Sequence, residues 1–246
     1  MAGVVAAITG SAPWALSFAA IHLVARVTAP SHLDGPTTGY WASSIASTLH
    51  GFGVTYLAMN TMVSGGFWSS TDLTHTTPAS EQCCHVYLGY LAADFVPLVW
   101  YGILRKDKAW KGSDVYLVHH FLSLWSWGLM LVRGHVHAVA VALLLLEATA
   151  PFTNGRWFLS TLGITKGPLY TLNGLAMAVS FLIVRVLLMG GLFVRYVVIL
   201  REPFFALPVS TWATILGSYA FGYPLQLFWF SKIAKGLLKV LSGKKA

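Results

Sequence analysis

The sequence predicts an all-α, multi-pass membrane protein with about seven transmembrane helices. Hydrophobic residues make up 56% of the 246 residues and charged residues only 10%, whereas about a quarter of the residues of a soluble domain are charged. The mean hydropathy is +0.67. The 16 Lys and Arg residues exceed the 8 Asp and Glu residues, but in such a chain this excess concerns membrane topology rather than nucleic acid.

Seven stretches approach the roughly 20 apolar residues that a helix needs to cross a bilayer. In chain order they are 3–25, 40–63, 85–104, 115–132, 136–155, 168–194 and 208–231. Gly, Pro and polar clusters separate them. The first stretch has no Lys or Arg before its apolar run, so we expect a retained span rather than a cleaved signal peptide. Seven spans place the two termini on opposite sides of the membrane.

The basic residues predict the orientation of the chain, because Lys and Arg are retained on the cytoplasmic side. Only Arg133, Arg195 and Arg201 fall on one face of the predicted topology, and Arg185 lies inside a span. The other twelve fall on the opposite face: Arg26, Arg105, Lys106, Lys108, Lys111, Arg156, Lys166, Lys232, Lys235, Lys239, Lys244 and Lys245. We therefore expect a lumenal amino terminus and a cytosolic carboxyl terminus. Orientation alone accounts for these charges, but basic loops can also hold anionic headgroups or the phosphates of a CoA-type substrate.

Cys83 and Cys84 are adjacent, and their Cα atoms are therefore too close for ordinary disulfide geometry. They form neither a disulfide framework nor a zinc site. The predicted topology places them in a lumenal loop, where no cation nearby in the sequence would activate either thiol. We expect both to be inert.

Polar side chains recur at membrane depth, where an ionisable group costs free energy unless it is paired or hydrated. The candidates are His50, Asp94, His119, His120, Glu147, Asn154, Arg156 and Arg185. If the helices pack with these groups inward, they line a polar chamber that opens toward the cytosol and ends at mid-membrane. For His50 alone we favour a hydrogen bond between helices over a catalytic role. We expect no metal and no resident cofactor.

The adjacent histidines at 119 and 120 point about 100° apart on a helix, yet both can border one chamber. An imidazole beside a carboxylate is suited to general base catalysis or to covalent acyl transfer. Glu147 or Asp94 can supply that carboxylate, and either can instead form an ion pair with Arg185 that only sets helix register. We take as catalytic candidates His119, His120 and Glu147.

Several motifs follow one another in a specific order. They are Trp41-Ala-Ser-Ser-Ile-Ala-Ser-Thr-Leu-His50, Gly89-Tyr-Leu-Ala-Ala-Asp94, His119-His120, Glu147-Ala-Thr-Ala-Pro-Phe-Thr-Asn-Gly-Arg-Trp157, Asn173-Gly174, Phe181-Leu-Ile-Val-Arg185 and Leu225-Gln-Leu-Phe-Trp-Phe-Ser-Lys-Ile-Ala-Lys-Gly236. This order resembles the TLC-domain family, which includes ceramide synthases and several small TLC-domain-containing proteins. The Pro-Phe-x-Asn-x-Arg-Trp string is most similar to the small members.

The resemblance implies six spans in a helical barrel around a central chamber, preceded by one extra span, in the endoplasmic reticulum or a connected membrane. The chain then divides into a first transmembrane helix with a cytosolic linker (1–35), a TLC domain (36–242) and a basic cytosolic tail (243–246). The lipid-binding side chains expected in the chamber are His50, Asp94, Asn154, Arg156, Asn173 and Arg185.

In ceramide synthases, paired histidines and a following Asp-x-x-Asp serve the transfer of a fatty acyl group from acyl-CoA to a sphingoid amine. In this sequence Glu147 stands at the first Asp position and Ala150 at the second. The resemblance thus implies roles for the histidine pair and Glu147, in a motif that differs from that of the synthases.

Three functions follow from these expectations. The first is a lipid-handling protein that binds a lipid or acyl chain in the chamber and influences membrane lipid composition. The second is a ceramide-synthase-like N-acyltransferase of sphingolipid metabolism, with acyl-CoA as co-substrate and a histidine, held by Glu147, that carries the acyl group. The third is a structural or cargo-binding membrane protein whose buried groups only join helices. Membrane lipids or fatty acyl chains are the expected partners, nucleic acid is not, and the oligomeric state stays open.

Overall fold

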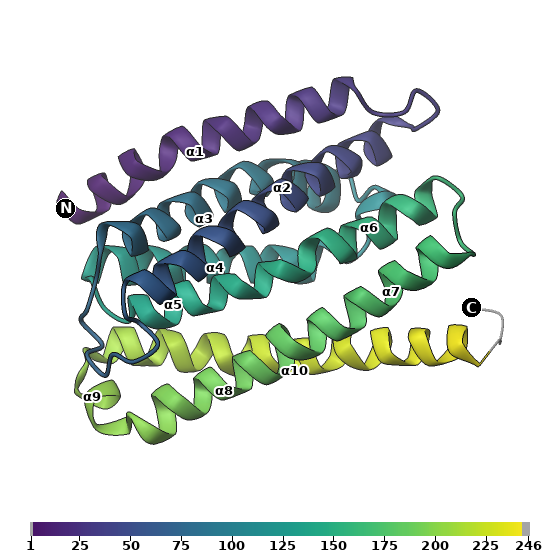
Figure 1. Cartoon of the computed structure of the whole chain (residues 1–246). Coiled ribbons are helices and arrows are strands. Elements are labelled where there is room, and N and C mark those ends of the chain that lie inside the picture. The colour runs from purple at the N-terminus through teal and green to yellow at the C-terminus, as the bar shows by residue number, and fades with distance from the viewer. Residues whose placement is uncertain (1, 243–246) are drawn as a thin grey trace.

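The computed structural model describes residues 2–242, which are helical almost throughout and include no strand. Seven long helical rods run roughly along a common axis (Figure 1). They correspond to the seven predicted stretches, and most begin earlier or end later than predicted. The predicted basic tail, 243–246, lies outside the described residues.

Four rods are single helices and three consist of consecutive helical segments. The single helices are α1 (Ala2–Val27), α2 (Gly35–Ser64), α4 (Ser113–Arg133) and α10 (Val209–Leu241). The composite rods are α3 with η1 (Pro78–Pro97, Leu98–Leu104), α5 with η3 and α6 (His137–Leu144, Leu145–Thr149, Ala150–Thr161), and α7 with η4, α8 and η5 (Pro168–Ser180, Phe181–Leu188, Met189–Phe193, Val194–Ile199). Two short helices lie in connections, η2 (Lys108–Trp110) and α9 (Arg201–Ala206).

Cys83 and Cys84 lie inside α3, which corrects the prediction that they fall in a loop. The helix begins at Pro78, directly after a Thr-x-x-Ser capping box that satisfies its first amide groups. The prediction placed the start of the span at residue 85 because the polar pair 81–82 lowers the apolarity of the first turns. Both cysteines are free and buried, so their surroundings are those of a helix interface.

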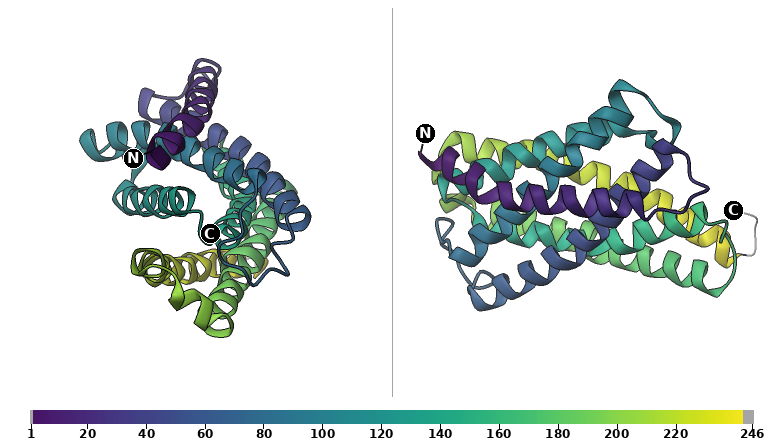
Figure 2. Two further views of the ribbon diagram at one scale, coloured as in Figure 1. Left: turned by 90° about the vertical axis from the view of Figure 1, so that its left-hand side faces the viewer. Right: turned by 90° about the horizontal axis from the view of Figure 1, so that it is seen from above.

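Six rods pack into a ring in the order α2, α3, α4, α10, α7 and α6, with α6 returning to α2. The helix α1 stands outside the ring and packs mainly on α3 and α2 (Figure 2). The ring has two unlike ends. We call the end with Arg105, Lys111 and Lys166 the basic end, and the other, where α5 lies inside the ring against α2, α3, α4 and α8, the α5 end.

Five rods are long and apolar enough to cross a membrane, which makes the chain a multi-pass membrane protein. They are Ala2–Val27, Pro78–Leu104, Ser113–Arg133, His137–Thr161 and Pro168–Ile199. The helices α2 and α10 have 30 and 33 residues but are more polar. Their polarity has a structural reason, because α2 presents serines and α10 presents Gln226 to the ring interior. Seven crossings therefore stay a prediction.

Candidate functional site

A cavity of about 290 Å³ lies inside the ring, in the half nearer the basic end. Each of the six ring rods contributes side chains to its wall. This volume is at the lower end of the roughly 300–1,000 Å³ typical of small-molecule pockets. The cavity therefore has room for a small polar group with a few carbon atoms around it.

The wall formed by α2 is lined with hydroxyl groups. Tyr40, Ser43, Ser44 and Ser47 recur at helical spacing and face the cavity together. Asn154 on α6 faces them, and its Nδ2 atom donates to the carbonyl oxygen of Ser44 at 3.1 Å. This bond holds α6 against α2, so Asn154 both lines the cavity and fixes one of its corners.

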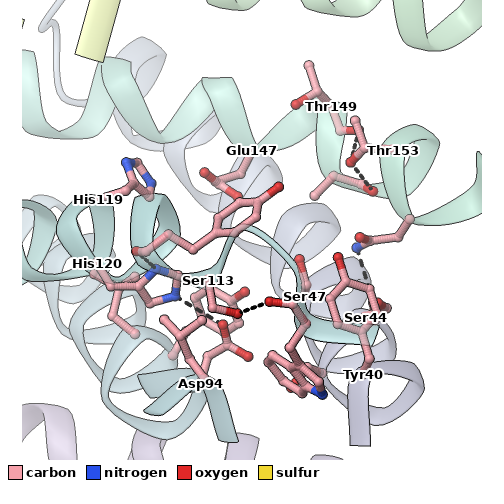
Figure 3. Close-up of a pocket in the computed structure, with 18 of the residues that line it drawn as sticks. Tyr40, Ser44, Ser47, Asp94, Ser113, His119, His120, Glu147, Thr149 and Thr153 are labelled. Carbon is pink, nitrogen blue, oxygen red and sulfur yellow. Dashed lines mark hydrogen bonds and ion pairs between the residues drawn. The ribbon is translucent and has the colours of Figure 1, made fainter. Parts of the chain in front are cut away.

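His120 and Asp94 form a bonded pair on the opposite side of the cavity (Figure 3). The Nε2 atom of His120 lies 3.0 Å from Oδ2 of Asp94, and Nδ1 lies 2.9 Å from the carbonyl oxygen of Tyr116. A carbonyl oxygen only accepts, so Nδ1 carries the hydrogen in that bond. Both ring nitrogens of His120 are thus occupied.

His119 lines the same cavity but makes different contacts. Its ring lies 5.9 Å from the ring of His120, centroid to centroid, at an interplanar angle of 80°. Within residues 2–242 its ring nitrogens have no hydrogen-bond partner. The two adjacent histidines therefore border one chamber, as the sequence predicts, with one engaged and one available to a ligand.

Arg185 pairs with Glu147, which settles a choice that the sequence leaves open. The Nη2 atom lies 3.7 Å from Oε1 of Glu147, and both side chains are more than four-fifths buried. The Nε atom donates to Oγ1 of Thr149 at 2.7 Å, and Nη1 donates to Oε1 of Gln226 at 3.3 Å. Of the two carboxylates that the sequence offers as partners of a histidine, Asp94 is the one that holds His120.

The position of Glu147 depends on a close approach between two helices. Its segment η3 lies directly against α2 at Gly51. A Cβ atom at Gly51 would lie only 2.9 Å from the carbonyl oxygen of Glu147, so a larger residue would push η3 away. Glycine is needed here because the backbone comes too close for a side chain.

Three of the predicted lipid-binding side chains do not line this cavity. His50 is buried behind it and stacks on Tyr90, with centroids 3.9 Å apart and rings 8° from parallel. Asn173 lies between α6 and α7, where its Nδ2 atom donates to the carbonyl oxygen of Phe152 at 2.9 Å. Arg156 lines a separate groove nearer the basic end. Residues at similar positions along a membrane helix can face different neighbours. Membrane depth alone therefore does not show which side chains line the cavity.

Sequence reasoning missed the hydroxyl wall and the two outer partners of Arg185. The side-chain oxygen atoms of Thr149 and Gln226 both accept hydrogen bonds from the buried guanidinium. The serines of α2 carry a readable signal, because residues 40, 43, 44 and 47 repeat at the spacing of one helix face. Residues 2–242 contain no cluster of three His, Cys, Asp or Glu side chains that could hold a metal ion.

Comparisons with known proteins agree with these observations. A family model described as the TLC domain matches residues 40–235. TLC domain-containing protein 4-B of Danio rerio is 28% identical over 214 residues, which cover 83% of this chain and 76% of the relative. TLC domain-containing protein 4 of Homo sapiens is 29% identical over 212 residues, covering 82% and 75%. No solved structure matches the chain.

Proposed function

The chain belongs to the TLC-domain family, and from that premise we propose that it is a lipid-handling protein whose cavity binds the polar end of a lipid or acyl chain. Through this binding it influences the lipid composition of its membrane. The family is membrane-associated and lipid-related. The observation that carries the proposal is the placement of charged and hydroxyl side chains from all six ring rods around one cavity.

The contrast between the interior and the outer surface supports a lipid as the ligand. Exposed apolar side chains such as Leu16, Phe52 and Leu187 cover the outside of the rods, as expected for contact with lipid tails. Inside, a charged group without partners would cost several kcal/mol. The cavity is too small for a whole long acyl chain, so the polar end fits inside while the tail extends out of the ring.

We place the basic end in the cytosol and the protein in the endoplasmic reticulum. The orientation rests on the excess of Lys and Arg at that end. The organelle rests on the family resemblance. In this orientation the cavity opens toward the cytosolic leaflet, where acyl-CoA and other cytosolic carriers have access.

One observation favours N-acyl transfer as a second candidate function. Both nitrogens of His120 are engaged, so His119 is the member of the pair with a nitrogen free to react. A neutral His119 would attack the thioester carbonyl of acyl-CoA through its unprotonated nitrogen, forming an acyl-imidazolium as the CoA thiolate leaves. A long-chain amine would then take the acyl group, and its proton would pass to the thiolate. In this reaction Asp94 would hold the ring of His120 in place through their hydrogen bond. Glu147 would neutralise the charge of Arg185.

The lipid-handling proposal is tested by the lipid that accompanies the purified full-length chain. We expect mass spectrometry to find a lipid retained through detergent exchange by the wild type. Ser47→Phe places a ring in the cavity and should lower that retention about tenfold or more. Leu49→Phe, two residues away on the exposed face of α2, should retain the wild-type amount. Equal retention in both variants, or none in the wild type, would contradict the proposal.

The acyltransfer candidate has a separate test. Purified protein incubated with palmitoyl-CoA and sphinganine should form ceramide, and His119→Ala should remove that product. His120→Ala and Asp94→Asn should reduce it. Absence of ceramide across acyl chain lengths would reject acyl transfer and leave the binding proposal standing. If cavity variants change only thermal stability, the structural or cargo-binding alternative is favoured.

A further inference from the structure

A second opening in the ring lies nearer the basic end than the cavity. It is a groove of about 290 Å³ between α6, α7 and α10. Lys232 lines it, one turn further along α10 than Trp229, which lines the cavity. Arg156 lines it from α6, two residues beyond Asn154 of the cavity wall. The groove and the cavity therefore follow one another along the same two helices toward the basic end.

Arg156 is held in place within the groove and keeps most of its donors free. Its guanidinium lies over the ring of Tyr170, 3.3 Å from the centroid, and Nη1 donates to the carbonyl oxygen of the same residue at 3.1 Å. No carboxylate among residues 2–242 forms an ion pair with it. A guanidinium has five N–H donors in a fixed fork that matches phosphate. The remaining donors of Arg156 are available to such a group.

A second cation shares the groove, and no acidic side chain of residues 2–242 lines it. The ammonium of Lys232 lies 5.2 Å from the ring centroid of Phe228. Two like charges beside one groove repel each other, and an anion between them removes that cost. Thr171 adds a hydroxyl group to the same wall. The membrane orientation of the chain explains why cations gather at this end. It does not explain why two of them line the same groove.

Two glycines keep the groove open. A Cβ atom at Gly236 would meet nothing within 4 Å, so this part of the wall is empty space. A Cβ atom at Gly174 would lie 3.2 Å from Nη1 of Arg156, so glycine lets the guanidinium lie against α7. The Asn173-Gly174 motif thus serves the groove, through its glycine, and the contact between α6 and α7, through its asparagine.

We propose that this groove is a phosphate subsite, in which Arg156 and Lys232 bind a phosphate group of the molecule whose other part occupies the cavity. The inference rests on the proposed function and narrows the substrate class to phosphate-bearing molecules. The phosphate belongs either to a lipid headgroup or to a water-soluble phosphorylated carrier. The same two cations serve both sources.

The test compares three probes on the full-length protein in neutral detergent. They are 1-palmitoyl lysophosphatidic acid, its uncharged counterpart monopalmitoylglycerol, and glycerol 3-phosphate, which has the phosphate without the chain. We expect the wild type to bind the lysophosphatidic acid about tenfold or more tightly than the uncharged lipid. Displacement of that lipid by glycerol 3-phosphate at comparable concentration would identify a water-soluble source, and its failure to compete would identify a lipid headgroup.

The variants separate the subsite from charge in general. Arg156→Gln and Lys232→Gln should each lower the preference for the phosphate to about threefold or less, and Gly236→Leu should do so without removing a charge. Lys235→Gln, an exposed cation of α10 outside the groove, should keep the wild-type preference. Lys232 is exposed on a helix, so its variant tests binding even if Arg156→Gln fails to fold.

The outcomes distinguish the two proposals. Equal wild-type affinity for the charged and uncharged lipids would overturn the phosphate subsite and leave the lipid-binding proposal intact. The same conclusion follows if Lys232→Gln and Lys235→Gln behave alike. If neither lipid binds the wild type, both proposals fail.

Discussion

The two halves of the ring are built from the same rods but have opposite interiors. At the α5 end the interior is closed, since α5 is buried along almost its whole length. His137, which is fully buried there, has its two ring nitrogens occupied by Ser80 at 2.9 Å and by the Met130 carbonyl oxygen at 3.2 Å. Toward the basic end the interior holds the Arg185–Glu147 ion pair, the hydrogen-bonded pair of His120 and Asp94, and a cavity.

From this difference we expect the α5 half to supply stability, and we propose that the half nearer the basic end supplies function. Buried apolar packing around α5 stabilises the ring. The charged half lowers stability wherever a partner is lost, because an unpaired charge inside a membrane protein is costly. Substitutions in the two halves should therefore separate unfolding from ligand retention.

The largest expected effect comes from removing one charge of a pair. Arg185→Met should destabilise the fold by about 3 kcal/mol, because it leaves Glu147 buried without a counter-ion. Thermal or denaturant unfolding in detergent measures this. Arg105→Met, which removes the exposed partner of Asp107, should cost less than about 1 kcal/mol. Similar small losses in both variants would mean that the Arg185 pair does not behave as a buried pair.

Truncation in the α5 half should affect stability alone. Leu144 is almost fully buried, and Leu144→Ala should cost about 2 kcal/mol through the cavity that it leaves. Retained lipid per folded molecule should stay at the wild-type amount. Leu49→Ala is the control, because Leu49 is exposed on the outer side of α2. Its truncation leaves no internal cavity, so we expect a smaller loss of stability than in Leu144→Ala. A loss of lipid in Leu144→Ala would show that the two halves are not independent.

The adjacent histidines sharpen the comparison within the polar half. His120→Ala strands the buried carboxylate of Asp94 and should cost about 1–3 kcal/mol of stability. His119→Ala removes no hydrogen bond within residues 2–242 and should therefore cost less stability than His120→Ala. Ligand retention should follow the reverse order, with the larger loss in His119→Ala. Equal stability losses would contradict the assignment of one engaged and one free imidazole.

The smallest expected effect is a pH dependence of the folding stability that comes from Asp34, a residue outside the membrane-spanning segments. Asp34 caps α2, and the Thr37 side chain and backbone amide that bond its carboxylate lower its pKa. A lowered pKa in the folded state gives stability that is present above the ordinary Asp pKa of about 3.9. It is lost as the pH falls through the lower folded value. The stability difference between the wild type and Asp34→Ala should therefore shrink below pH 4, whereas Asp34→Asn should show little pH dependence from this position.

The fold was largely predictable from the sequence, because long apolar stretches with few charged residues determine where membrane helices run. Helix ends were less so, as α3 shows: its capping residues extend the helix through a polar pair that hydropathy excludes. The pairing of charges lay beyond the sequence, because Asp94 and Glu147 have similar depths and only the ring order brings Glu147 to Arg185. For the same reason the sequence predicts His50 and Asn173 among the cavity residues, although their side chains contact other parts of the helix packing.

The most direct test of the central claim is an experimental density map of the purified full-length chain in a lipid nanodisc. We predict density for the polar end of a lipid between His119 and Ser47, continuing out of the ring toward Arg156 and Lys232. A cavity that holds only water, or one filled by its own side chains, would contradict the claim that this chamber binds lipid.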